Sequence, residues 1–140
     1  MRTKLAPLYV SLLTLSLAGC VDGMTSPSID EAILGTYELK SINENELPFL
    51  LIDDEYRKVE VVTGSIVLND DGTFSDAIDY QITPVDAPAG PWSDVITGTF
   101  VQNPGALSMV SDKGGVYDVS MAEDGRLSQL IGEYTLVYAR

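Results

Sequence analysis

Apolar and polar residues alternate along most of the chain from residue 35 to its end. In residues 36–41, every second side chain is apolar or small, which is typical of a strand with one buried face. The same period of two recurs in residues 57–62, 64–69, 74–82, 95–101, 106–110, 116–121, 127–131 and 134–139. Short turn sequences rich in Asn, Asp, Pro and Gly separate these segments. We therefore predict an all-β fold, an antiparallel meander of eight or nine strands that closes into a barrel.

Three segments interrupt this pattern. Residues 28–31 fit a capping box with Ser28 at the cap and Glu31 three residues on, which predicts one short helical turn. Residues 44–55 have no regular period, and we expect a long loop that folds an apolar patch over an open end of the barrel. Residues 84–91 predict a second loop, with Trp92 as a lid residue or a cover for an open barrel end.

Asp76 departs from its surroundings in another way. It falls on the apolar face of the strand predicted over residues 74–82. An acid in that position predicts either a β-bulge or a buried carboxylate with a partner.

The first 19 residues follow the pattern of a secretory signal peptide. Basic Arg2 and Lys4 precede an apolar run over residues 8–17, and small residues follow it. An uncleaved transmembrane anchor is the alternative, but the run is shorter than the roughly 20 residues of a spanning helix. The sequence Leu17-Ala18-Gly19-Cys20 resembles the lipobox of bacterial lipoproteins. This resemblance implies cleavage before Cys20 and lipid attachment, including palmitate, to that cysteine.

The domain organisation follows from the lipobox. We expect a lipoprotein signal peptide over residues 1–19, a lipidated tether over residues 20–28 and a barrel domain over residues 29–140. Cys20 is the only cysteine, so no intramolecular disulfide can form, and lipid attachment would consume its thiol. The alternative is a small residue near an ordinary cleavage site. Val21 follows Cys20, which in bacterial lipoproteins favours transport to the outer membrane. The expected location is therefore the cell envelope, facing the periplasm or the outside.

A second resemblance covers nearly the whole predicted barrel. The segments that carry it are Gly35–Asn43, Leu47-Pro48, Gly64–Phe74, Gly98–Phe100, Leu107–Met109 and Tyr134–Tyr138. Together they resemble small bacterial lipocalin-like lipoprotein domains. Gly35-Thr36-Tyr37 stands where lipocalins carry glycine, any residue and tryptophan, with tyrosine in place of the tryptophan. The resemblance implies a small up-and-down barrel, with or without an apolar cavity, and supplies no ligand.

Charge and composition exclude several functions. The chain has 8 basic and 21 acidic residues, and loss of Arg2 and Lys4 with a signal peptide would leave a net charge of −15. Such a surface repels phosphate backbones, so we expect no nucleic-acid partner and attribute membrane attachment to the covalent lipid. Histidine is absent from the sequence. Histidine-dependent nucleophile systems and the usual zinc sites are therefore excluded.

Carboxylates are the remaining candidates for chemistry. A pair of them could hydrolyse glycosides, but chance pairs are expected in so acidic a chain, and we predict no enzyme. The acidic segments 53–55 and 69–72 offer the oxygen ligands that Ca²⁺ prefers. They lack the alternate spacing of an EF-hand loop, and turn formation already explains residues 69–72. We predict no metal and no cofactor other than the lipid at Cys20.

A binding role is the remaining hypothesis. The barrel either encloses a cavity or is filled by its own large side chains, and we favour a filled or nearly filled barrel. Residues predicted to point inward and fill it include Leu107, Met109, Val119, Met121 and Leu127. Aromatic residues that would line a cavity are Tyr37, Phe74, Tyr80 and Phe100. We expect a membrane-anchored, non-enzymatic binding or interaction module that contacts an envelope protein; the alternative is a carrier or sensor of a small hydrophobic ligand.

Overall fold

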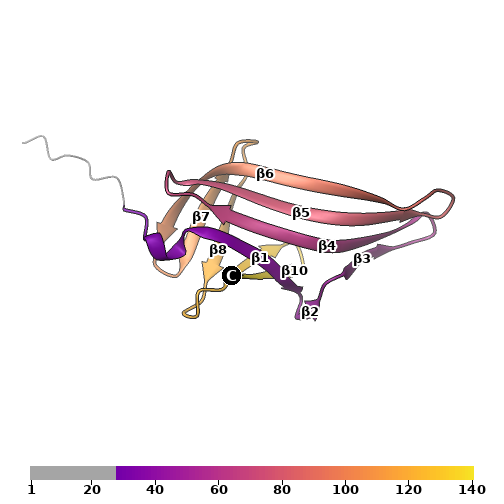
Figure 1. The fold of residues 1–140 in the computed structure, drawn as a ribbon, viewed down its shortest axis with the longest axis horizontal. Coiled ribbons are helices and arrows are strands. Elements are labelled where there is room, and N and C mark those ends of the chain that lie inside the picture. Colours follow the sequence, from indigo (N-terminus) through magenta and orange to yellow (C-terminus); the bar gives the residue numbers. More distant parts are fainter. Residues whose placement is uncertain (1–27) are drawn as a thin grey trace, which may run out of the picture.

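The computed structural model describes residues 28–140 and shows a closed antiparallel β-barrel, as predicted from the sequence (Figure 1). Within this range the elements are η1 (Glu31–Ile33), β1 (Gly35–Ile42), β2 (Asn45–Glu46), β3 (Phe49–Asp53), β4 (Arg57–Leu68), β5 (Thr73–Pro84), β6 (Gly90–Asn103), β7 (Ala106–Ser111), β8 (Val116–Met121), β9 (Leu127–Ile131) and β10 (Tyr134–Ala139). The predicted signal peptide and the lipid-attachment residue Cys20 lie outside the described residues.

Strand β1 closes the barrel because it pairs on both of its edges. One edge pairs with β10, and the other pairs with the end of β4, where Gly35 lies opposite Leu68 and Glu38 opposite Ser65. The order around the barrel is β1-β10-β9-β8-β7-β6-β5-β4, and each neighbouring pair is antiparallel. Eight strands therefore form the wall, with β2 and β3 as additional strands at its edge.

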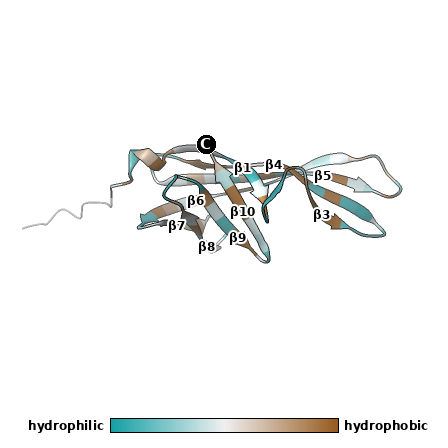
Figure 2. Cartoon of the chain, turned by 90° about the horizontal axis from the view of Figure 1, so that it is seen from below, coloured by the Kyte–Doolittle hydropathy of each residue, from teal (hydrophilic) through white to brown (hydrophobic). Residues whose placement is uncertain are grey.

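Part of the sheet projects beyond the barrel wall. Strands β4, β5 and β6 have 12, 12 and 14 residues, whereas β7 and β8 have six each. The longer strands continue past the end of the barrel, and β3 pairs along the edge of β4 there (Figure 1). We call this projection the lip: β3 with residues 57–63, 78–84 and 90–96. Apolar residues continue onto its strands β3 and β5 (Figure 2).

The prediction of a long loop over residues 44–55 is wrong, because the structure has strands β2 and β3 in this segment. Strand β3 contains a register shift between Leu50 and Ile52, which places consecutive apolar side chains out of phase. That irregularity removes the period of two by which a strand is recognised. The apolar patch itself packs on the core through Phe49 and Leu51, as expected for a cover at the barrel end.

Trp92 was also misplaced by the sequence pattern. It lies on β6 and not in a loop, opposite Tyr80 of β5, with the two ring centroids 5.3 Å apart. About half of its side chain remains exposed, at 54%. The preceding loop is shorter than predicted, because β6 already begins at Gly90.

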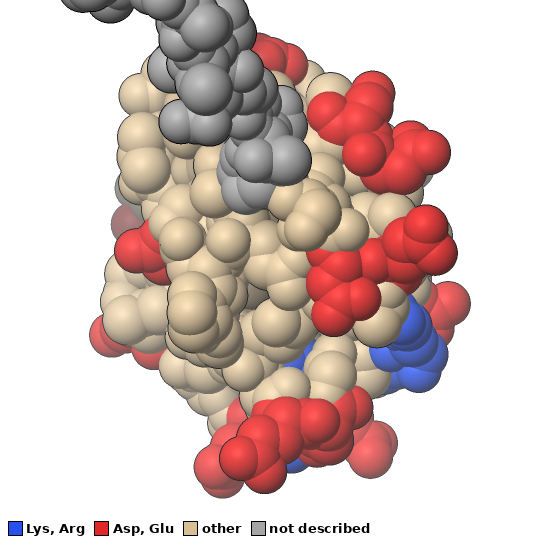
Figure 3. All heavy atoms as spheres, turned by 90° about the vertical axis from the view of Figure 1, so that its left-hand side faces the viewer, with Lys and Arg blue, Asp and Glu red and all other residues tan. Residues whose placement is uncertain are grey.

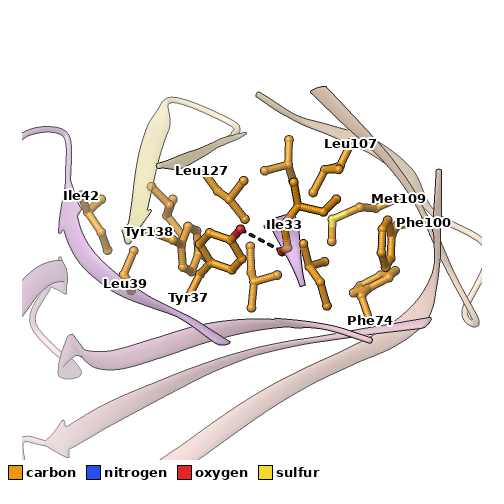
Figure 4. Packing of buried hydrophobic residues seen from close by; sticks show 14 of the residues in the cluster. Ile33, Tyr37, Leu39, Ile42, Phe74, Phe100, Leu107, Met109, Leu127 and Tyr138 are labelled. Carbon is orange, nitrogen blue, oxygen red and sulfur yellow. Dashed lines mark hydrogen bonds between the residues drawn. The ribbon is translucent and has the colours of Figure 1, made fainter. Parts of the chain in front are cut away.

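The core fills the barrel at the end away from the lip, which we call the closed end (Figure 4). All five side chains predicted to fill the interior face it, and Met121 alone among them is partly exposed. Helical turn η1 covers this end with the buried side chain of Ile33, whose carbonyl accepts a hydrogen bond from Tyr37 Oη at 2.8 Å. The predicted turn is thus confirmed as one turn of 3₁₀ helix.

The residue that caps this turn differs from the prediction. Asp30 is the N-cap, and its carboxylate accepts from the Ala32 amide at 2.9 Å, a role that the sequence pattern assigned to Ser28. The turn begins only at Glu31, so the residue directly before it, Asp30, is the one that caps the free Ala32 amide. Arg140 holds the turn on the barrel, because its guanidinium donates to the Ala32 carbonyl and to Tyr37 Oη and lies 4.6 Å from the Tyr37 ring centroid.

Acidic groups make up most of the charged surface seen from the closed end. Carboxylates form several separate patches there, and Lys or Arg occupy a much smaller area (Figure 3). Across residues 28–140, no helix has the length and apolar character needed to cross a bilayer.

Candidate functional site

An apolar pocket of about 230 Å³ opens at the end of the barrel from which the lip projects, which we call the mouth. It lies between the lip on one side and the β9–β10 hairpin on the other. Its lining residues are Ile42, Leu51, Val61, Ile78, Tyr80, Ile131, Tyr134 and Leu136. Apart from two tyrosine hydroxyls, these side chains offer only hydrocarbon or aromatic surface. The pocket therefore suits an apolar guest.

Local features of the strands direct these side chains into the pocket. A register shift between Val61 and Thr63 changes the phase of β4, so that Val59 and Val61 are buried before it and Ile66 and Leu68 after it. A tight turn between β9 and β10, with Gly132 at a φ of 61°, pairs Ile131 with Tyr134 at the rim. Glycine adopts this positive φ without a steric cost.

An aromatic contact joins the two sides of the mouth. The ring of Phe49 on β3 packs edge-on against Tyr134 on β10, with centroids 5.8 Å apart. Aromatic pairs in this geometry are favourable beyond their buried area. The contact therefore fixes the lip against the β9–β10 hairpin and gives the pocket a side wall.

Buried polar side chains form the floor beneath the pocket. Asp76 lies on the same face of β5 as Ile78, two residues deeper in the barrel, and Gln129 is the register partner of Leu136. Gln129 Nε2 donates to Asp76 Oδ2 at 3.4 Å, and Gln129 Oε1 accepts from Tyr138 Oη at 3.3 Å. The sequence-based alternative of a buried acid with a partner is therefore confirmed.

The hydrogen bonding of this floor is incomplete. Asp76 Oδ1 and Tyr117 Oη are both buried, and neither has a hydrogen-bond partner among residues 28–140. Burial raises the pKa of Asp76 to about 6, against the opposing effect of hydrogen bonding from Gln129 and proximity to Tyr117, and the nearby Asp94 carboxylate raises it further. Burial also raises the pKa of both Tyr117 and Tyr138, with the Asp76 carboxylate adding to each shift. Burial thus disfavours the charged form of each of these groups, and Asp76 becomes protonated near pH 6.

One of the four aromatic residues proposed from the sequence as ligand contacts lines this pocket. Tyr80 forms part of its wall, where burial raises the pKa of its hydroxyl. Tyr37, Phe74 and Phe100 lie in the core instead, with 1%, 2% and 4% of their surface exposed. Phe74 also packs edge-on against Tyr117 at 6.1 Å between centroids.

Sequence reasoning missed most of the pocket because its residues come from strand ends that are far apart in the chain. Ile131 and Tyr134 carried the clearest signal, since they flank a turn and an aliphatic or aromatic side chain beside a turn often faces an open end. Leu51 lies on β3, within the segment for which the sequence pattern predicts a loop.

The acidic turns use their carboxylates to satisfy backbone groups. Asp71 Oδ1 accepts from both the amide and the hydroxyl of Thr73, and Asp54 Oδ1 accepts from the amides of Tyr56 and Arg57. These hydrogen bonds lower the pKa of both carboxyl groups. Within residues 28–140, no three acidic, histidine or cysteine side chains are arranged to hold a metal ion.

Comparisons of this chain with protein-family models, with curated proteins and with solved structures each returned no match. The fold and the pocket together define the class of the described domain, a closed eight-stranded antiparallel barrel with an apolar mouth.

Proposed function

We propose that this protein is a lipocalin-like lipoprotein of the cell envelope that binds a small hydrophobic ligand at the mouth of its barrel. One observation carries the proposal: eight apolar or aromatic side chains from six strands converge on a solvent-accessible pocket in a barrel that is otherwise filled. Concave apolar sites of this kind are the usual places where proteins bind small molecules. Of the two binding roles expected from the sequence, a carrier or sensor fits this site better than a protein-interaction module.

The pocket volume limits the size of the ligand. A volume of about 230 Å³ is larger than a cavity of about 150 Å³ that holds benzene, and smaller than the roughly 300 Å³ of the smallest drug-sized sites. A single ring or a short acyl segment therefore fits inside the pocket, and the remainder of a larger ligand would extend through its open mouth. Burial of six methylene groups contributes about 5 kcal/mol, which corresponds to a Kd of roughly 0.1–1 mM for the apolar part alone.

The proposed anchor is a lipid, including palmitate, on Cys20 at the outer membrane. The support is the sequence Leu17-Ala18-Gly19-Cys20 behind a basic and apolar signal segment. The described chain begins with Ser28 beside the β6–β7 turn, and β1 runs from that closed end toward the mouth (Figure 1). An anchor that reaches the barrel at its closed end leaves the pocket unobstructed by the anchoring membrane. The proposed role requires no catalytic residue, metal or further cofactor.

Two measurements test ligand binding. Native mass spectrometry of the barrel, purified with Cys20 replaced by Ala, should detect a co-purifying hydrophobe. In addition, the neutral apolar dye N-phenyl-1-naphthylamine should bind with enhanced fluorescence. Absence of both signals would refute the proposal.

Two neighbouring residues on β9 provide a matched pair of variants. Ile131 lines the pocket and is 44% exposed, whereas Leu130 points away from it and is 69% exposed. We expect Ile131→Gln to weaken dye binding severalfold, because it replaces part of the apolar wall with an amide. Leu130→Gln should bind the dye as the unmodified barrel does, and equal effects of the two substitutions would place the dye elsewhere.

A further inference from the structure

A carboxylate without a basic partner stands on the inner wall beside the pocket. Asp94 on β6 is the register partner of the pocket residue Ile78, so both side chains lie on the inner face of the sheet. Asp94 is partly buried and close enough to Tyr80 to raise the pKa of its hydroxyl. Among residues 28–140, it forms no ion pair with a lysine or arginine.

A second carboxylate lies deeper on the same wall. Asp76 is 4% exposed, and its Oδ1 atom has no hydrogen-bond partner in the described part of the chain. The side chains that face it from other strands are Asp94, Tyr117, Gln129 and Tyr138. None of them is basic. A buried carboxylate with one long hydrogen bond and no positive partner is electrostatically unfavourable, and a bound cation would relieve that cost.

The turn between β9 and β10 adds a third acidic side chain at the mouth. Glu133 lies exposed in the turn between the pocket residues Ile131 and Tyr134. Low-dielectric walls of one charge sign concentrate ions of the opposite sign. The apolar wall and the carboxylates together select a guest with two parts, one hydrocarbon and one positively charged.

We propose that the mouth pocket binds a cationic amphiphile, with its apolar group against Ile78, Leu136 and Tyr134 and its protonated amine beside Asp94, in the field of Asp76 behind it. This inference rests on the ligand-binding role proposed above and specifies the ligand class. A bare metal ion fits less well, since the lining offers mainly hydrocarbon surface and a metal needs several oxygen ligands. Fatty acids and other anionic amphiphiles meet repulsion from both carboxylates.

Three probes with the same chain length test the proposal: n-octylammonium, 1-octanol and octanoate. Trp92 is the only tryptophan, and it stacks near the pocket residue Tyr80, so its fluorescence provides a local readout of binding. Isothermal titration calorimetry on the same samples gives an independent Kd. We expect octylammonium to bind at least tenfold more tightly than octanol at pH 7.5, with octanoate the weakest of the three.

Charge-removing variants locate the amine. Asp94→Asn and Asp76→Asn should each weaken octylammonium binding severalfold more than octanol binding, so that the preference for octylammonium over octanol falls. Asp70→Asn is the matched control, because it removes the same charge from an exposed turn at the closed end. The preference should also decline between pH 7.5 and pH 5, as Asp76 with its pKa of about 6 becomes protonated, and this decline should be smaller in Asp76→Asn.

The outcomes separate the two proposals. If octanol binds and octylammonium binds no more tightly, the cationic preference is refuted while the hydrophobic pocket stands. If the preference survives unchanged in both Asp94→Asn and Asp76→Asn, these carboxylates do not receive the amine and the inference is likewise refuted. If none of the three probes binds, the ligand-binding role itself is refuted.

Discussion

Gln129 on β9 hydrogen-bonds Asp76 on β5 across the interior of the barrel, with 3.4 Å between Nε2 and Oδ2. Strands β5 and β9 are not neighbours in the sheet, so this bond spans the barrel from one wall to another. Both side chains are 4% exposed. The distance is near the upper limit for a hydrogen bond, and the second carboxylate oxygen has no partner in residues 28–140. The ionised form of Asp76 is therefore poorly stabilised.

This arrangement predicts an unusual dependence of stability on pH. The pKa of Asp76 is raised in the folded state to about 6 from 3.8. Between these values the folded protein holds more protons than the unfolded chain, so the free energy of unfolding falls as pH rises through this window. A shift of this size corresponds to a loss of about 3 kcal/mol at pH 7–8. Asp76→Asn removes the ionisation, and we expect it to be more stable than the unmodified protein at pH 8 by about 1–3 kcal/mol.

Urea unfolding at pH 8, 6 and 4.5 measures this difference. The advantage of Asp76→Asn should shrink as pH falls, because the aspartate is then also neutral. Asp70→Asn controls for net charge at an exposed site, since Asp70 lies in the turn at the closed end. A difference between Asp76→Asn and the unmodified protein that stays constant across the three pH values would contradict the linkage.

The burial of Asp76 was predictable from the sequence, but the identity of its partner was not. Alternation along β5 places an acid among apolar residues, and only a bulge or burial satisfies that pattern. Gln129 is 53 residues away along the chain, and its inward direction depends on the register of β9. Which side chains meet across a barrel depends on how the whole sheet closes. The alternation of residues within one strand carries no information about that closure.

Sequence patterns do not predict the lip. Turns and alternating residues identify strands and their order, and the eight-stranded closure follows from them. The register shifts in β3 and β4 move successive apolar residues between faces, so the period of two is lost where the pocket forms. A pocket built from bulged strands and distant strand ends therefore becomes visible only in three dimensions.

Gly98 marks a close approach between β6 and β7, and its substitution should be severely destabilising. A Cβ atom there would lie 2.0 Å from the Val110 carbonyl oxygen and 2.9 Å from both the Phe74 ring and Ser111 Cα. Two of these contacts are with backbone, so relief requires the strands to separate. We expect Gly98→Ala to lose about 3 kcal/mol or more of unfolding free energy, or to prevent soluble folding.

Gly90 on the same strand provides the control for this prediction. A Cβ atom at Gly90 meets nothing within 4 Å, so Gly90→Ala should unfold within about 1 kcal/mol of the unmodified protein. Chemical denaturation of both variants followed by circular dichroism makes the comparison. Equal stability of the two variants would show that β6 and β7 are further apart than described.

Replacement of Cys20 tests the proposed anchor independently of the ligand. A thioether and an amide at one N-terminal cysteine attach several acyl chains, and stable membrane binding requires at least two hydrophobic attachments. If the proposed signal peptide is removed, the formal charge is −15, and anionic headgroups should then repel the barrel itself. We therefore expect Cys20→Ala to move the protein from the membrane fraction to the soluble fraction and to abolish labelling by radioactive palmitate.

Ser26→Ala, a nearby substitution that leaves the cysteine intact, should preserve both membrane attachment and palmitate labelling. Retention of Cys20→Ala in the membrane fraction at the level of Ser26→Ala would refute the lipid anchor.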